Sequence, residues 1–154
     1  MAPARFPLAT IGYEAASVPR FLDALVAARV DLLVDIRAVA SSRRPGFAKT
    51  ALAANLATVG IEYLHLRDLG TPAEGRKAAR AGDHATLREI FLAHLKTTAA
   101  QDALDTLVER IRAGRRACLL CLEALPEHCH RSLVVDALTP HLPLDVTHLR
   151  VLAG

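Results

Sequence analysis

The chain has 154 residues, of which 52% are hydrophobic and 23% are charged, and its formal net charge at pH 7 is +3. The hydrophobic share excludes a disordered chain, and the length predicts a single domain over residues 1–154 with enough material for a core. Aromatic residues make up only 4%, which argues against a single-stranded nucleic-acid binder built on stacking platforms.

We predict a cytoplasmic protein, because we recognise no targeting signal and the chain has few cysteines. Residues 1–7 are short for a signal peptide and contain two prolines. No apolar run approaches the length of a membrane span, so we expect no membrane partner. The chain has only three cysteines, an odd number, and we expect their thiols to be reduced.

The chain begins with the patterns of a strand and a helix. Residues 8–11 predict a strand, which ends before Tyr13 and Glu14. Ser17 is a favourable N-cap for a helix over 18–29, whose apolar residues recur at helical spacing. We therefore expect Tyr13 and Glu14 to lie in the loop at the carboxyl end of the first strand.

The second strand, predicted over 32–36, is apolar on both faces except for Asp35. A strand of this kind is typical of the centre of a parallel sheet. The long loop after it is basic and contains Arg37, Arg43, Arg44 and Lys49. With Gly46, these cations could close over an anion; the alternative is a solvated loop.

The middle of the chain continues this alternation with one interruption. We predict a helix over 51–59, ended by Gly60, and a third strand over 61–66. Residues 68–82 are rich in Gly, Pro, Ala and charge without a clear period, so we expect a mobile excursion that could act as a lid. Two helices should follow: one through 87–95, capped by Asp83 or Thr86, and one over 100–112, ended by Gly114.

The most informative stretch is a strand, a tight loop and a helix. An apolar run over 117–122 predicts a buried fourth strand, which Glu123 follows directly. Pro126 suits the first turn of the next helix. In or near that turn lie Cys129, His130 and Arg131. In α/β proteins this corner is where ligands bind.

A fifth strand is predicted over 146–151, after prolines that end the preceding helix. The alternation predicts an α/β fold: one three-layer domain with a mostly parallel sheet of about five strands and helices on both faces. The carboxyl ends of such strands share one edge. We therefore expect one rim to hold Tyr13, Glu14, Asp35, Arg37, His65, Arg67 and residues 123–131.

Three segments of the chain resemble motifs of the DUF488 family of small bacterial proteins. They are Thr10-Ile11-Gly12-Tyr13-Glu14 with Ser17; Val34-Asp35-Ile36-Arg37 through Ser42-Arg43-Arg44-Pro45-Gly46-Phe47 to Lys49; and Leu120-Cys121-Leu122-Glu123 with Pro126 and Cys129-His130-Arg131. The chain departs from the family at Ala15, usually Gly, and at Ala40, usually Pro. The resemblance implies an α/β domain, but the family has no settled biochemical function.

The cysteines give weaker indications of chemistry. Cys118 and Cys121 are three apart on one strand and face opposite sides, so they cannot share a metal, and we expect Cys118 in the core. A zinc site of Cys121, Cys129 and His130 lacks an evident fourth ligand, and we predict no metal site. Cys129 near a helix start could be a nucleophile, but its helical phase directs it toward the sheet.

The first functional hypothesis is an enzyme for an anionic, phosphate-bearing substrate, such as a nucleotide or a nucleic-acid end. Arg37, Arg131 and the helix start after Pro126 would hold the anion. Glu123 or Asp35 would act as general acid or base in hydrolysis or group transfer, and His130 would position or move a proton. The other substrate-binding candidates are Tyr13, Glu14, Arg43, Arg44, Lys49 and Cys129.

Two alternatives remain open at this point, and the sequence requires no cofactor for any of the three hypotheses. One is a non-catalytic module that binds an anion or a partner, in which the ion pairs of the rim are structural. The other is a metal- or thiol-dependent enzyme that uses Cys121, Cys129 and His130.

Overall fold

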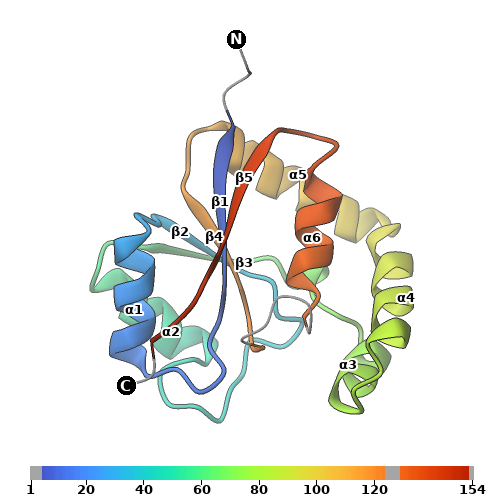
Figure 1. Ribbon diagram of the computed structural model, residues 1–154, viewed down its shortest axis with the longest axis horizontal. Coiled ribbons are helices and arrows are strands. Elements are labelled where there is room, and N and C mark those ends of the chain that lie inside the picture. The colour runs from blue at the N-terminus through green and yellow to red at the C-terminus, as the bar shows by residue number, and fades with distance from the viewer. Residues whose placement is uncertain (1–4, 124–128, 153–154) are drawn as a thin grey trace.

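A computed structural model of the chain describes residues 5–123 and 129–152. Its centre is a sheet of five strands in which each pair of neighbours is parallel (Figure 1). In spatial order these are β3 (Glu62–His65), β2 (Leu32–Asp35), β4 (Ala117–Cys121), β1 (Phe6–Gly12) and β5 (Leu144–Leu149). The predicted α/β fold with a parallel five-stranded sheet is confirmed.

The two central strands explain where the polar residues converge. Every residue of β2 and β4 is buried, as expected for strands covered on both faces. In the register of the sheet, Gly12 lies beside Cys121, and Asp35 lies beside Leu120. The carboxyl ends of β1, β2 and β4 are therefore neighbours, and the loops that leave them share one edge.

Helices cover both faces of the sheet, as predicted (Figure 1). One face is covered by α1 (Val18–Ala27) and α2 (Lys49–Ala57), with Phe21, Leu25, Leu52 and Leu56 buried against it. The other face is covered by α4 (His84–Leu95), α5 (Thr98–Arg112) and α6 (Arg131–Leu138), with Phe91, Leu104, Leu107, Val134 and Leu138 buried. No helix in the part of the chain that the structure describes is long and apolar enough to cross a bilayer.

Local signals fix most helix ends where the sequence places them. The Ser17 side chain accepts a hydrogen bond from the Arg20 amide, and Asp83 accepts one from the Thr86 amide. Of the two predicted caps for α4, Asp83 is therefore the correct one. Gly60 and Gly114 follow α2 and α5 with φ of 74° and 92°, a region that favours glycine.

The segment 68–82 was predicted to be an irregular excursion, but much of it is helical. It contains the end of η1 (Arg67–Leu69), a 3₁₀ turn, and the α-helix α3 (Ala73–Arg80), which packs on α4. The helix is hard to recognise because Gly75 lies inside it. A Cβ on Gly75 would lie 2.5 Å from the Thr71 methyl carbon and 3.5 Å from a Leu87 methyl carbon, so glycine permits this close packing.

The helix after β4 also begins later than its prediction. Pro126, predicted in its first turn, lies outside the described residues, and α6 begins at Arg131. His130 occupies the N-cap position of α6, and Cys129 lies directly before it. These residues therefore come from the connection between β4 and the start of α6.

Candidate functional site

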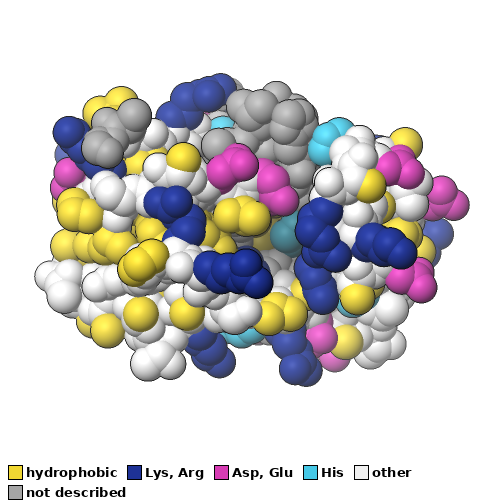
Figure 2. All heavy atoms as spheres, turned by 90° about the horizontal axis from the view of Figure 1, so that it is seen from below, with side chains coloured by type: hydrophobic (Ala, Val, Ile, Leu, Met, Phe, Trp, Pro, Cys, Tyr) yellow, Lys and Arg dark blue, Asp and Glu magenta, His cyan; other side chains and the backbone are white. Residues whose placement is uncertain are grey.

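A pocket of about 230 Å³ lies at the carboxyl ends of β1, β2 and β4, beside α3. Among its lining residues are Tyr13, Arg37, Ser41, Thr71, Arg76, Arg80, Cys121, Glu123 and His130. Figure 2 views this end of the molecule and shows Lys and Arg side chains on both sides of a hollow, with acidic side chains at its margin. Four residues predicted for the site, Tyr13, Arg37, Glu123 and His130, therefore meet in one pocket.

The floor of the pocket is built on a buried ion pair between Asp35 and Arg37. Arg37 Nε and Nη2 donate to the two carboxylate oxygens of Asp35 at 2.9 and 2.7 Å. The Arg37 amide and the Tyr63 hydroxyl donate to the same carboxylate at 3.0 and 2.6 Å. Asp35 is fully buried beneath the pocket and is not among its lining residues. Its charge is balanced by protein donors.

Arg37 is fixed on its other side as well. Its Nη1 donates to the Tyr13 hydroxyl at 3.2 Å and to the Phe47 carbonyl at 2.7 Å. Burial alone would lower the pKa of Arg37, but the hydrogen bonds and charge of Asp35, with the Tyr13 hydrogen bond, raise it above its ordinary value. Arg37 is therefore a protonated guanidinium held in one position, and the Asp35 carboxylate offsets its charge.

His130 is held in one tautomer by a backbone carbonyl. Its Nε2 lies 2.8 Å from the Ile36 carbonyl oxygen, which can only accept, so Nε2 carries the hydrogen. Burial lowers the pKa of His130 to about 4, although the Ile36 hydrogen bond acts in the opposite direction. The ring is therefore neutral near pH 7, and its other nitrogen, Nδ1, is an acceptor that lies 3.6 Å from Cys129 Sγ.

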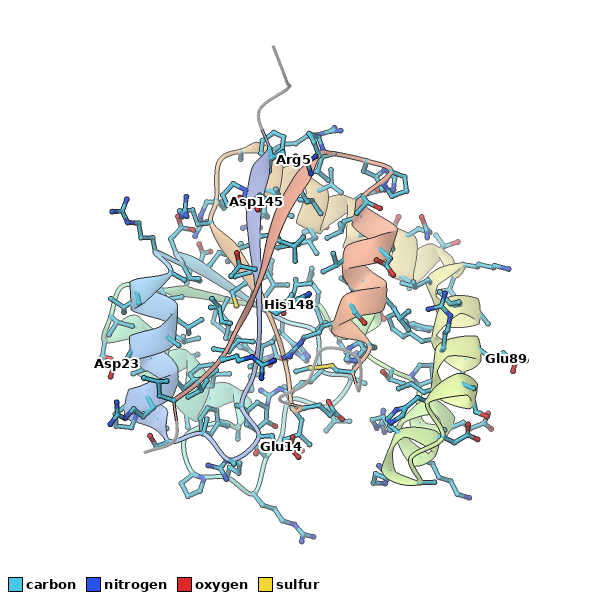
Figure 3. The ribbon with its side chains drawn as sticks, in the orientation of Figure 1. Arg5, Glu14, Asp23, Glu89, Asp145 and His148 are labelled. Carbon is cyan, nitrogen blue, oxygen red and sulfur yellow. A yellow bond between two sulfur atoms is a disulfide. The ribbon has the colours of Figure 1, made fainter. Side chains whose placement is uncertain are left out.

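Two cysteines of the site are joined to each other. Cys121, the last residue of β4, and Cys129 form a disulfide across a sequence separation of 8 (Figure 3). Cys118 is the free cysteine and lies in the core with α1 and α2, as predicted. The expectation that all thiols are reduced is therefore wrong for Cys121 and Cys129. The pairing depends on how the chain returns after β4, which neither residue's local sequence reveals.

The same corner contains the groups that come nearest to a metal site. Ligand atoms of Cys121, Glu123 and Cys129 lie within 4.8 Å of one another. They could hold a metal ion together only after the disulfide is reduced. The cationic Nη1 of Arg131 lies 3.9 Å from Cys121 Sγ, which opposes a second cation there. His130, included in the zinc hypothesis, directs Nε2 to Ile36 instead.

Several predicted binding residues lie outside the pocket. Arg43 is exposed on the loop before α2, Lys49 is exposed as the first residue of α2, and Glu14 is exposed in the loop after β1 (Figure 3). Arg44 donates to the Ala16 carbonyl and lies over the Phe47 ring. None of these four lines the pocket.

Arg131, predicted to hold the anion, does not line the pocket either. It is fully buried, and Gly12 allows its guanidinium to approach β1, because a Cβ there would lie 2.8 Å from Arg131 Nη1. Neither Arg131 nor Cys129 is among the lining residues, so both lie behind the pocket wall.

Two arginines that sequence reasoning missed come from α3. Arg76 and Arg80 line the pocket and are four residues apart, so they lie on the same side of the helix. Arg76 is half-buried and donates from Nη1 to the Thr71 carbonyl at 2.9 Å, whereas Arg80 is exposed. Their i, i+4 spacing was a usable signal, but it has meaning only once the segment is known to be helical.

A larger hollow of about 660 Å³ lies between α1 and the edge strand β5. It is lined by small and apolar residues such as Ala24, Ala28 and Leu149, with Arg20 and Asp145 among its charged residues. None of the residues predicted for the site lines it. The chemically capable side chains are therefore concentrated in the smaller pocket at the strand ends.

Comparison with known protein families identifies this chain. The family model described as "Domain of unknown function DUF488" matches residues 17–138. This range includes the motifs around Asp35 and Glu123 and begins after the motif at Thr10–Glu14. No curated protein matches the chain.

Proposed function

Because the chain belongs to the DUF488 family, a domain of unknown function, we propose its function from the pocket: it binds a small phosphate-bearing anion and catalyses hydrolysis or group transfer on it. The observation that supports this most is the charge of the lining. Arg37, Arg76 and Arg80 line the pocket, and among the described lining residues Glu123 is the acidic one. Arginine forks donate paired hydrogen bonds to phosphate and carboxylate oxygens.

The size of the pocket limits the ligand. About 230 Å³ is below the range of roughly 300–1,000 Å³ that drug-sized ligands occupy. The pocket therefore suits a phosphate group with a small organic part, or the terminal phosphate of a nucleotide or nucleic-acid end. A dinucleotide is too large to be enclosed.

The positive residues have different tasks in this proposal. Arg76 and Arg80 would contact the anion. Arg80 is exposed, and Arg76 uses Nη1 for a hydrogen bond to the Thr71 carbonyl, which leaves its other N–H groups to donate to a ligand. Arg37 would be a fixed guanidinium behind the ligand, paired with Asp35. We assign Asp35 a positioning role, because its carboxylate already accepts from Arg37 and Tyr63.

Glu123 would supply the acid or base, and His130 would support the pocket wall beside it. Glu123 is half-buried in the lining, directly after the buried strand β4, and would act as general acid or base. His130 would hold the loop after β2 through the Ile36 carbonyl and offer its neutral ring to the pocket wall. With its pKa lowered to about 4 by burial, His130 is a poor proton donor near pH 7.

A non-catalytic anion-binding module is the second candidate. The observation that favours it is the Asp35–Arg37 pair, whose hydrogen bonds tie Tyr13, Phe47 and Tyr63 together without a ligand. In that case the pocket would bind the anion and release it unchanged.

The variant Glu123→Gln tests the catalytic part. We expect it to fold almost normally, to bind inorganic pyrophosphate as well as the wild type, and to lose turnover of small phosphate esters by a factor of about 100 or more. Glu89→Gln, on the exposed side of α4 (Figure 3), is the matched control and should keep full turnover. Calorimetric titration gives binding, and phosphate release gives turnover. If wild-type protein binds anions but turns over no ester, the non-catalytic module is correct.

A further inference from the structure

The disulfide between Cys121 and Cys129 lies at the pocket, whereas the third cysteine lies in the core. Cys118 lies three residues before Cys121 on the same strand, is fully buried, and remains a free thiol. Burial raises the pKa of the Cys118 thiol, which makes it an unreactive core residue. Cys121 is also buried, but it forms part of the pocket wall. Cys121 is therefore the side of the bond that lies nearer to a reagent in the pocket.

Polar groups surround both sulfur atoms. The guanidinium Nη1 of Arg131 lies 3.9 Å from Cys121 Sγ, and the Arg131 amide lies 3.5 Å from Cys129 Sγ as a donor. Nδ1 of His130 is 3.6 Å from Cys129 Sγ, but it is an acceptor and does not stabilise a thiolate, so the favourable contact at Cys129 is the Arg131 amide. A nearby cation and an N–H donor stabilise a thiolate, so each sulfur has a group that favours its release when the bond is broken.

We propose that Cys121 and Cys129 form a reversible thiol–disulfide exchange site, and that its reductant is a small thiol carrying a carboxylate. The preference for a negatively charged thiol follows from Arg37, Arg76 and Arg80 in the pocket lining, and in this respect it rests on the proposed anion pocket. The exchange site itself rests on the paired sulfurs and their polar surroundings.

The exchange proceeds in two steps that balance. The thiolate of the small thiol attacks Cys121 Sγ, which forms a mixed disulfide and releases Cys129 as a thiolate beside the Arg131 amide. A second thiolate then attacks the small-molecule sulfur of the mixed disulfide and releases Cys121 as a thiolate beside the Arg131 guanidinium. In total, two small thiols become one disulfide, and the protein gains two electrons and two protons. The reverse reaction restores the protein disulfide.

Reduction would also alter the pocket, because the disulfide joins the end of β4 to the residue before His130. Cys121 is two residues before Glu123, and Cys129 is adjacent to His130. The disulfide therefore ties the segment that presents Glu123 to the segment that presents His130. Exchange at this site would be expected to change how these two lining residues are held.

The test compares three small thiols acting on the folded, oxidised protein: 3-mercaptopropionate (negative), 2-mercaptoethanol (neutral) and cysteamine (positive). Alkylation and mass spectrometry measure how fast the disulfide is lost, and each rate is divided by the rate of the same thiol on the unfolded protein. We expect 3-mercaptopropionate to exceed cysteamine by about tenfold or more. The double variant Arg76→Ala/Arg80→Ala should reduce this ratio to about two, whereas Lys77→Ala, exposed on the same helix, should leave it unchanged.

Controls separate the exchange site from the anion pocket. Cys118→Ser should behave like the wild type, and Cys129→Ser should yield no protein disulfide at all. Three free thiols in protein purified in air, or a disulfide that none of the reagents reduces in the folded state, would overturn the exchange site. Equal normalised rates for the three thiols would overturn the charge preference. Failure of phosphate to bind the oxidised protein, measured separately, would instead refute the proposed function.

Discussion

The pocket has two sides that carry the same residue type in different states. On its floor, Arg37 is buried and donates to Asp35, Tyr13 and the Phe47 carbonyl. On the α3 side, Arg80 is exposed, and Arg76 is half-buried with one hydrogen bond to Thr71. The floor is therefore committed to the fold, and the α3 side keeps donors for a ligand.

This difference teaches that position in the sheet, and not residue type, decides what an arginine does. The floor follows β2, whose residues are all buried, so a charge there requires partners within the protein. The α3 side belongs to a short charged helix at the surface, where a guanidinium remains hydrated until an anion arrives. Substitutions on the two sides should therefore affect different measurements.

The largest expected effect is on stability at the floor. Arg37→Ala leaves the buried Asp35 carboxylate without its cation, and we expect a loss of about 3–5 kcal/mol in the free energy of unfolding. Urea denaturation followed by circular dichroism measures this loss. Arg80→Ala should change stability by less than about 0.5 kcal/mol. Equal losses for the two variants would remove the distinction between floor and α3 side.

The second effect is a pH dependence that belongs to His130. Its pKa is lowered from 6.5 to about 4 by burial, so the unfolded chain binds the proton more readily. The stability that neutral His130 contributes is present above about pH 6.5 and is lost as the pH falls toward 4, by roughly 2–3 kcal/mol.

Unfolding measured at pH 7.5 and 4.5 tests this sign and size. His130→Gln does not titrate and can still donate to the Ile36 carbonyl, so its loss of stability on acidification should be smaller than that of the wild type. The exposed His141→Gln should behave as the wild type does. A wild type that becomes more stable on acidification relative to His130→Gln would contradict the assigned tautomer and burial.

The third effect is on affinity at the α3 side. Arg76→Ala/Arg80→Ala removes the proposed anion donors, and we expect the Kd for pyrophosphate to rise by about 10- to 100-fold. The variant should unfold at nearly the same urea concentration as the wild type. Lys77→Ala, between the two arginines in sequence and absent from the lining, is the matched control. An unchanged Kd in the double variant would place the anion elsewhere.

The smallest effect is expected where the sequence alone suggested binding. Arg43 and Lys49 are exposed outside the pocket lining, so Arg43→Ala and Lys49→Ala should each change the pyrophosphate Kd by less than about twofold. Raising the salt concentration should cancel even this change, because distant exposed charges are screened. A tenfold loss in either variant would show that the loop before α2, or the start of α2, closes over the ligand.

Much of the fold was predictable because its signals are local. The run Ala117–Cys121 is apolar throughout, and a strand of this kind needs a cover on both faces, which fixes the parallel sheet. Parallel topology then places Tyr13, Arg37 and Glu123 at one edge, so their meeting in one pocket followed from the order of strands.

The rest depended on contacts between distant segments. Gly75 makes α3 hard to recognise from the sequence, because glycine is unfavourable inside a helix and is present here to allow close packing against Thr71 and Leu87. Unless the segment is known to be helical, the spacing of Arg76 and Arg80 does not place them on one side. Arg44 lies outside the pocket and donates to the Ala16 carbonyl. This contact joins two loops that are distant in the sequence, so no local pattern predicts it. Pairing of Cys121 with Cys129 likewise depends on the path of the chain after β4.

The most direct test of the central claim is an NMR titration of the oxidised wild-type protein with inorganic pyrophosphate. We predict that amide signals of residues 37–41, 71–80 and 129–131 shift in a saturable way, because these segments line or support the pocket. Signals of residues 20–28 and 145–150, which border the larger hollow, should stay unchanged. Saturable shifts at the larger hollow, or no saturable shift at residues 71–80, would contradict the assignment of the pocket as the anion site.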